Sequence, residues 1–117
     1  MTRDEYLKNA LKTGLSPKAG SVYVTLLEAG LALSPKSLVL KTKLHRQYVY
    51  DALYELEDNG LVVRVGEARK VKYQATSPDK LLQEAEKKRI ETLGGVQALM
   101  KLYDRSPAGI VEVIRGS

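Results

Sequence analysis

Apolar residues recur every three or four positions through the first half of the chain, a spacing that predicts helices with one buried face. The predicted helices span residues 3–13, 17–29, 35–41 and 45–58. A Ser-Pro pair begins the second and the third helix, where serine caps the helix and proline suits its first turn. The fourth helix has the most regular pattern, and we expect its buried face to consist of Val49, Ala52, Leu53 and Leu56.

The periodicity changes after the fourth helix. Two alternating, β-branched runs, residues 61–65 and 71–75, flank a loop that contains Gly66. This arrangement is typical of an antiparallel hairpin. Helices followed directly by a hairpin are the element order of a winged helix-turn-helix, in which one helix enters the DNA major groove. We therefore predict a mainly α fold with a small β-hairpin, and a winged helix-turn-helix domain over residues 1–77.

A further capped helix follows Ser77 and Pro78 and opens a C-terminal region of residues 78–117. Its apolar stripe continues past Gly94 and Gly95, where each glycine costs about 1 kcal/mol relative to alanine, so we expect a kink or a break into two helices. The stripe is partly at heptad spacing, which favours a dimerisation helix over a helix that folds back on its own domain. The predicted interface residues are Leu82, Ala85, Leu93, Val96, Leu99, Met100 and Tyr103.

The basic residues are concentrated in two segments of the predicted winged domain. The formal charge of the chain is +5, and neither residues 34–50 nor residues 68–73 contain an acid. Acidic residues gather instead at the end of the fourth helix. Charge separated in this way favours a directed basic surface that binds a polyanion over a uniformly solvated one.

The fourth helix, about residues 45–58, is the predicted recognition helix, and residues 64–73 form the predicted basic wing. In this position Arg46 can bond to guanine and Gln47 to adenine, while the wing cations suit backbone phosphates. Tyr48 can donate to a phosphate or pack against a thymine methyl group. The predicted DNA contacts are Lys36, Lys43, His45, Arg46, Gln47, Tyr48, Arg64, Arg69, Lys70 and Lys72.

Each candidate also has a simpler explanation. Arg46 and Gln47 are equally well accounted for as solvated surface, and the wing cations as charges that keep an exposed hairpin soluble. Histidine at position 45 is more typical of a helix start than of a ligand or a pH sensor. We expect Tyr50 and Tyr54 to pack in the core rather than to contact DNA.

Other functional classes find little support. The chain has no cysteine, which excludes disulfides and thiolate chemistry. Its serines fall at helix caps, no phosphate-binding glycine loop follows a strand, and Asp51 is better explained as a salt-bridge partner than as a base. We expect no enzymatic activity, no metal and no cofactor. The apolar runs are too short to cross a bilayer and the N-terminus lacks a signal-peptide core, so we expect no membrane partner and a cytoplasmic location.

Two stretches resemble the archaeal TrmB-like transcriptional regulators. They are GLSPKAGSVYVTLLEAG at residues 14–30 and VYDALYELEDNGLVVRV at residues 49–65, and Tyr73 with the following Ser77-Pro78 fits the same pattern. The resemblance covers about residues 11–82. It implies a winged-helix domain that binds promoter DNA, usually as a dimer, and activates or represses transcription.

The chain also departs from this family pattern. Lys43 stands where the family commonly has glycine, and Tyr48 occupies a position that is often basic. Many members carry a large sugar-binding domain at the C-terminus, whereas here residues 110–114 predict only a short strand that resembles the start of such a domain. A piece of a longer regulator and a small stand-alone member both stay open, and the residues present support no small-molecule effector.

We therefore expect a sequence-specific DNA-binding transcriptional regulator that binds double-stranded DNA as a homodimer. The alternative is a winged-helix module that contacts other proteins in a larger assembly. Acidic residues on the recognition helix and the wing would favour that alternative, but these positions are mainly basic.

Overall fold

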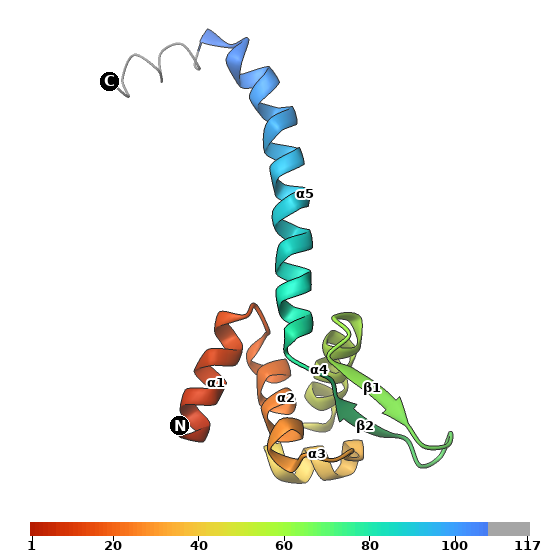
Figure 1. Ribbon diagram of the computed structural model, residues 1–117. Coiled ribbons are helices and arrows are strands. Elements are labelled where there is room, and N and C mark those ends of the chain that lie inside the picture. The colour runs from red at the N-terminus through yellow and green to blue at the C-terminus, as the bar shows by residue number, and fades with distance from the viewer. Residues whose placement is uncertain (108–117) are drawn as a thin grey trace. The chain divides into compact units, whose positions relative to one another are not determined.

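The computed structural model describes residues 1–107, which form five helices and one antiparallel hairpin (Figure 1). The helices are α1 (Arg3–Lys12), α2 (Pro17–Ala29), α3 (Pro35–Thr42), α4 (Arg46–Asp58) and α5 (Asp79–Asp104), and the strands are β1 (Val62–Val65) and β2 (Lys72–Ala75). The predicted mainly α fold with a small hairpin is confirmed. The strand predicted at residues 110–114 lies outside the described residues.

Local chemistry sets the helix ends in the first unit of the chain, Met1–Leu82. Ser16 caps α2 by accepting a hydrogen bond from the backbone N–H of Ala19 at 3.2 Å. Ser34 caps α3 in the same way, with Ser37 as the donor at 3.1 Å. Gly30 ends α2 with a φ of 68°, a conformation that glycine adopts without steric cost.

The core of this unit lies between α2, α3, α4 and β1. Its largest fully buried side chains are Val22, Leu26, Leu38, Val49, Leu53, Leu56 and Leu61. All four residues predicted for the inner face of α4 are buried. Because α2 and α4 pack along this face, the orientation of α4 about its own axis is determined by its sequence pattern.

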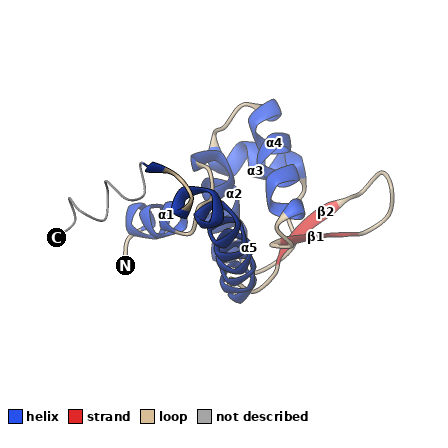
Figure 2. Ribbon diagram, turned by 90° about the horizontal axis from the view of Figure 1, so that it is seen from above, coloured by secondary structure: helices blue, strands red, loops and turns tan. Residues whose placement is uncertain are grey.

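An isolated backbone bridge joins the hairpin to the segment after α2. Strands β1 and β2 pair antiparallel, with Val62 opposite Ala75 and Val65 opposite Lys72. Leu33 forms a bridge to Tyr73 through two backbone hydrogen bonds of 2.8 and 2.9 Å. The paired strands therefore begin at the helical core, and the loop that joins them extends to one side of it (Figure 2).

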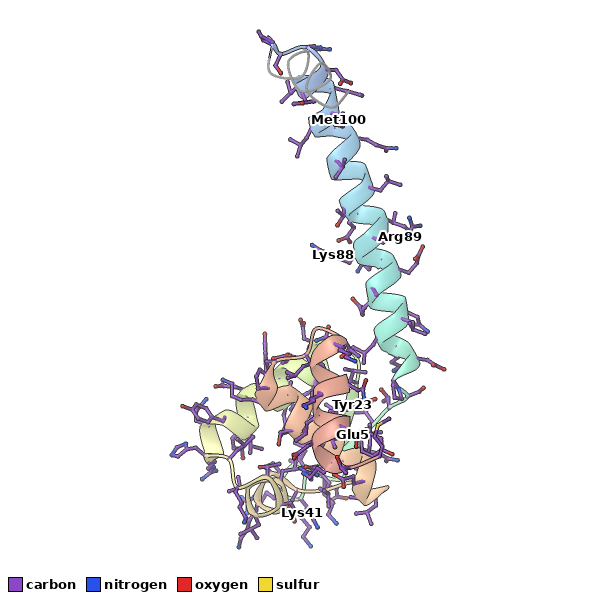
Figure 3. All side chains as sticks on the ribbon, turned by 90° about the vertical axis from the view of Figure 1, so that its left-hand side faces the viewer. Glu5, Tyr23, Lys41, Lys88, Arg89 and Met100 are labelled. Atoms are coloured by element: carbon purple, nitrogen blue, oxygen red, sulfur yellow. The ribbon has the colours of Figure 1, made fainter. Side chains whose placement is uncertain are left out.

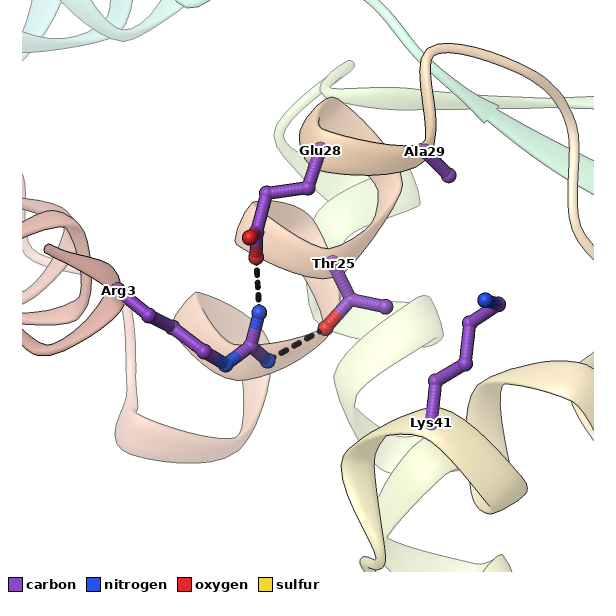
Figure 4. A pocket seen from close by; sticks show the side chains of 5 residues that line it. All are labelled: Arg3, Thr25, Glu28, Ala29 and Lys41. Carbon is purple, nitrogen blue, oxygen red and sulfur yellow. Dashed lines mark hydrogen bonds and ion pairs between the residues drawn. The ribbon is translucent and has the colours of Figure 1, made fainter.

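A polar cluster fastens α1 to α2. An open pocket of about 240 Å³ is lined by Arg3, Thr25, Glu28, Ala29 and Lys41 (Figure 4). The Arg3 guanidinium forms an ion pair with Glu28 and donates to the Thr25 hydroxyl at 2.8 Å. Thr25 is buried, but Arg3 and Glu28 are partly exposed, so their ion pair positions α1 more than it stabilises the fold.

Helix α5 begins in the first unit and continues into a second unit, Gln83–Ser117. It is one uninterrupted α-helix of 26 residues, so of the kink or break predicted at Gly94 and Gly95 the break is wrong. Two penalties of about 1 kcal/mol are offset by strong helix formers such as Leu, Glu, Lys and Ala on either side. None of its residues is buried. No helix among residues 1–107 is long and apolar enough to span a membrane.

Tyr23 ties α2 to the segment that leaves the hairpin. Its hydroxyl donates to the backbone carbonyl of Thr76 at 2.7 Å, and its side chain is only 3% exposed. Thr76 in turn donates through its backbone N–H to Leu61 and through its hydroxyl to Gly60. Burial raises the pKa of Tyr23 to about 12, because the ionised phenolate would lose its hydration.

Replacing Tyr23 with phenylalanine tests this connection. The variant leaves the Thr76 carbonyl without its donor, and we expect a loss of about 1–2 kcal/mol in the free energy of unfolding near pH 7. Below pH ~10 the phenol is protonated in the folded and the unfolded chain, so its contribution is complete. Between pH ~10 and a pH of about 12 the phenol ionises in the unfolded chain but not yet in the folded chain. Ionisation favours the unfolded chain, so the contribution of Tyr23 to the free energy of unfolding is lost in this range.

Denaturant titrations of both proteins between pH 7 and 12 provide the measurement. The stability advantage of the original chain over Tyr23→Phe should fall by up to about 2.7 kcal/mol as the pH rises through this range, and so disappear or change sign. A difference that stays constant would contradict the proposed burial of a neutral phenol.

Candidate nucleic-acid interface

Burial of one face of α4 determines which side chains it presents outward. At 100° per residue, Gln47, Asp51 and Tyr54 lie opposite the buried Val49 and Leu53. Tyr54 is 77% exposed and is the most exposed tyrosine of this helix. The outward face of α4 is thus polar and aromatic, and it is available to a partner.

The structure corrects the prediction for two tyrosines. Tyr50 is 39% exposed and Tyr54 is 77% exposed, so neither packs in the core. Tyr54 follows the buried Leu53 by one residue, a step that turns its side chain well away from the core. Tracing the helical face residue by residue would have shown this, whereas the general tendency of tyrosine to be half buried did not.

The first turn of α4 is organised by local contacts. His45 caps the helix, its Nδ1 accepting from the backbone N–H of Gln47 at 3.3 Å, which confirms its predicted place at the helix start. The guanidinium carbon of Arg46 lies 5.5 Å from the centre of the Tyr50 ring. Tyr48 makes an edge contact with the imidazole of His45. These contacts restrict the side chains at the start of α4.

Lys18 of α2 joins this surface, although the sequence pattern did not single it out. Its Nζ lies 3.8 Å from a carboxylate oxygen of Asp51 and 4.8 Å from the centre of the Tyr48 ring. Asp51, expected to be a salt-bridge partner, also accepts from the side-chain amide of Gln47 at 3.0 Å. Gln47 therefore keeps its carbonyl oxygen and one amide hydrogen for other partners.

The turn between α3 and α4 depends on an unusual backbone conformation. Lys43 ends α3 with a φ of 61°. Among residues 1–107 every other residue with a positive φ is a glycine. Its backbone N–H donates to the carbonyl of Val39 at 2.9 Å. The position where the TrmB-like pattern has glycine is thus a left-handed helix end, and lysine adopts it at a cost of about 1 kcal/mol.

The hairpin loop presents its cations to solvent. Arg69, Lys70 and Lys72 are all exposed. Gly66 has a φ of 93°, and a Cβ atom there would lie 2.6 Å from the carbonyl oxygen of Lys70. A hydrogen bond of 2.7 Å from the Lys70 N–H to the Glu67 carbonyl closes the turn. Glycine at position 66 therefore allows the tight loop that carries these charges.

Arg64 is held differently from the other wing cations. Its Nε and one terminal nitrogen donate to the two carboxylate oxygens of Glu57 at 3.0 and 3.1 Å. The guanidinium also lies 5.8 Å from the centre of the Tyr73 ring. Hydrogen bonding to Glu57, and then the charge interactions with Tyr73 and Glu57, raise the pKa of Arg64. This side chain links β1 to the end of α4.

All ten predicted DNA-contact residues are exposed, and they come from α3, the following turn, α4 and the hairpin. Gln47 is hydrogen-bonded to Asp51 and Arg64 to Glu57, and the contacts described above pair none of the other eight with an acid. The predicted interface residues of α5 are exposed as well, except for Tyr103, which is half-buried. They lie on one side of that helix at 100° per residue.

Lys43 provides a test of the turn. In Lys43→Gly the left-handed conformation becomes free of strain, so we expect a gain of about 1 kcal/mol in the free energy of unfolding. Lys43→Ala removes the same charge but keeps a Cβ atom, and it should bring no such gain. Thermal melts of the three proteins provide the measurement. A melting temperature that is unchanged or lower in Lys43→Gly would contradict the assigned backbone geometry.

Comparison with solved structures finds winged-helix proteins. TrmBL2, described as an archaeal chromatin protein with a novel mode of DNA binding, has a TM-score of 0.78 and 20% identity, over 96% of this chain and 46% of its own. The ST1889 protein of Sulfolobus tokodaii has a TM-score of 0.57 and 21% identity, over 78% of this chain and 99% of its own. A MarR family protein from Bacillus stearothermophilus has a TM-score of 0.53 and 25% identity, over 96% of this chain and 77% of its own.

These similarities establish the winged-helix fold, and the chain spans less than half the length of TrmBL2. No curated protein matches the sequence. The family model described as "Sugar-specific transcriptional regulator TrmB" matches residues 10–79, which is more than half of the chain and agrees with the resemblance seen in the sequence. The chain therefore belongs to the TrmB family of transcriptional regulators.

Proposed function

We propose that this protein is a sequence-specific DNA-binding regulator, with α4 in the major groove and the hairpin loop on the phosphate backbone. The observation that carries the proposal is the exposed basic and amide surface formed by the first turn of α4 and the hairpin loop, on a winged-helix unit of the TrmB family. A helix of this size fits the major groove, where base edges display distinct donor and acceptor patterns.

The outward face of α4 offers three kinds of base contact. Arg46 can donate two hydrogen bonds to guanine, and the free amide groups of Gln47 can pair with adenine. Asp51 can accept from the amino group of cytosine, provided that Lys18 continues to balance its charge. Tyr54 extends this face by one further turn and can pack against a thymine methyl group.

The remaining cations suit the phosphate backbone. Lys36 lies in the first turn of α3 and Lys43 in the turn before α4, while Arg69 and Lys70 lie in the hairpin loop and Lys72 begins β2. All five are exposed, and DNA that contacts α4 and the hairpin would place its phosphates near these cations. Such contacts hold a protein in register on the duplex and make binding strongly dependent on salt.

We assign Arg64 to positioning rather than to phosphate binding. Its two hydrogen bonds to Glu57 connect the base of the wing to α4, so both elements would approach DNA as one rigid surface. A phosphate could recruit Arg64 only by competing with this carboxylate.

We further propose that the protein binds as a homodimer through the apolar stripe of α5. Two copies related by a twofold axis would place their recognition helices on half-sites about one helical turn, roughly 34 Å, apart.

DNA as the partner is supported by TrmBL2, which is described as a DNA-binding chromatin protein. The alternative, a module that binds proteins, is weakened by the exposed cations of α3, the turn before α4 and the hairpin.

Binding to random duplex DNA at increasing salt separates these functions. We expect binding at low salt and a steep loss of affinity as salt rises, because each phosphate contact releases condensed counterions. If the protein bound no duplex at low ionic strength, the proposed function as a DNA-binding regulator would be contradicted and the protein-binding module favoured.

Two sets of substitutions distinguish contacts to the phosphate backbone from contacts to the bases. Arg69→Ala with Lys70→Ala should weaken binding evenly across sequences and reduce the salt slope by about 2. Arg46→Ala should cost about 1–3 kcal/mol on the preferred site and little on other sequences. A matched control removes two exposed lysines of α1, Lys8 and Lys12, and should leave affinity unchanged. If Arg46→Ala lost the same affinity on all sequences, Arg46 would contact only phosphate.

The role of Arg64 is tested by comparing it with its partner. If Arg64 positions the wing, Arg64→Ala and Glu57→Ala both loosen β1 and both weaken binding, with the salt slope nearly unchanged. If Arg64 contacts phosphate instead, Arg64→Ala lowers the salt slope by about 1 and Glu57→Ala strengthens binding by removing an acid. Binding titrations at several salt concentrations decide between these two results.

A further inference from the structure

Two contacts join Gln47 of α4 to Lys18 of α2 through one carboxylate. The side-chain amide of Gln47 donates to Oδ1 of Asp51 at 3.0 Å, and the Nζ of Lys18 lies 3.8 Å from Oδ2 of the same group. Gln47 and Asp51 are one turn apart on the outward face of α4, whereas Lys18 belongs to the first turn of α2. The series Lys18, Asp51 and Gln47 therefore connects a second helix to a side chain that we propose contacts the bases.

The backbone that carries Lys18 is fixed relative to α4. Ser16 donates through its N–H and its hydroxyl to the carboxylate of Glu55, at 3.0 and 2.7 Å. Ala19, on the other side of Lys18, is fully buried. The Nζ of Lys18 also lies 4.8 Å from the centre of the Tyr48 ring. The ammonium group is thus held between a carboxylate and an aromatic ring of α4, and both attract a cation.

The carboxylate determines which end of the Gln47 amide faces it. An ionised carboxylate only accepts hydrogen bonds, so the NH₂ group must face Asp51. One N–H and the carbonyl oxygen stay available, and this is the donor and acceptor pair that matches N7 and the amino group of adenine. An unrestrained amide can instead turn both N–H groups to N7 and O6 of guanine, which are acceptors. The bond to Asp51 therefore favours adenine over guanine.

We propose that Asp51 and Lys18 are positioning residues that make Gln47 selective for adenine. This inference rests on the proposed function, in which α4 lies in the major groove. The side chains of Lys18 and Asp51 are 41% and 48% exposed, so their ion pair adds little to folding stability and acts mainly on orientation. The carboxylate keeps further lone pairs, so the proposed contact of Asp51 with cytosine stays compatible with this role.

Lys18 also holds the charge of Asp51 in balance. Without the ammonium group the carboxylate would face the DNA phosphates uncompensated, and repulsion would turn it away from the DNA and from Gln47. A simpler role for Lys18 is a direct contact with phosphate. That role would lower affinity on all sequences alike when Lys18 is lost, and it would leave the preference between bases unchanged.

Selection from random duplex DNA with the full chain and its variants separates these roles. Gln47→Ala identifies the base pair that Gln47 contacts, as the position where the selected preference disappears. The quantity measured there is the ratio of affinities for two duplexes that differ only in having adenine or guanine. Asp51→Asn, which keeps the shape but removes the charge, should lower this ratio roughly tenfold.

Variants of Lys18 test its action through Asp51. Lys18→Met should lower the adenine-to-guanine ratio in the same direction and by a smaller factor, whereas Lys18→Arg keeps the charge and should preserve the ratio. Adding Lys18→Met to Asp51→Asn should lower the ratio no further, because the carboxylate through which Lys18 acts is already absent.

Lys41→Met is the matched control. This exposed lysine projects from α3 (Figure 3) and lines the pocket that contains the ion pair of Arg3 and Glu28. Its loss removes one positive charge from the same unit without touching Asp51. We therefore expect the adenine-to-guanine ratio to stay unchanged in this variant.

The outcomes distinguish this inference from the proposed function. If the original chain enriches no sequence, the proposed base contacts of α4 fail. If a sequence is enriched but Gln47→Ala alters no position, or alters one that is not adenine, the inference is overturned and the proposed function stands. The same holds if Asp51→Asn leaves the ratio unchanged. If Lys18→Met keeps the ratio and reduces the salt slope by about 1, Lys18 contacts phosphate and its positioning role is wrong.

Discussion

The inner face of α4 carries Val49, Leu53 and Leu56, each with at most 1% of its surface exposed. The packing of this face against α2 orients every other side chain of the helix. Glu55 reinforces the contact, since its carboxylate accepts from the N–H and the hydroxyl of Ser16 at 3.0 and 2.7 Å. The same serine caps α2, so one polar contact joins the start of α2 to the end of α4. The surface that we propose faces DNA is therefore a consequence of core packing.

Local signals in the sequence predicted most of the fold. Ser-Pro pairs, helix-ending glycines and the alternation of the two strands act over a few residues, and the elements up to Ala75 were predicted within one residue. The continuity of α5 was missed because helix formers outweigh two glycines. The left-handed Lys43 was not predictable from propensity, because only the surrounding turn makes lysine adopt that conformation.

The candidate site was predictable in type but not in arrangement. Exposure of the predicted cations followed from charge segregation, whereas the contacts of Lys18 with Asp51 and of Arg64 with Glu57 depend on packing between separate elements. Tyr54 was assigned to the core from its residue type, and its position on the helix overrides that tendency. The resulting surface separates side chains suited to bases on α4 from cations suited to phosphates on the wing.

Selection of binding sites from a pool of random duplex DNA tests the central claim most directly, because one consensus reports specificity, symmetry and spacing together. If α4 of each copy in a dimer contacts the bases of one half-site, the selection should enrich a sequence with two inverted half-sites. The centres of these half-sites should lie about one helical turn apart. Recovery of no enriched sequence, with binding that depends only on salt, would contradict base reading by α4. A single half-site without symmetry would contradict the dimer on DNA.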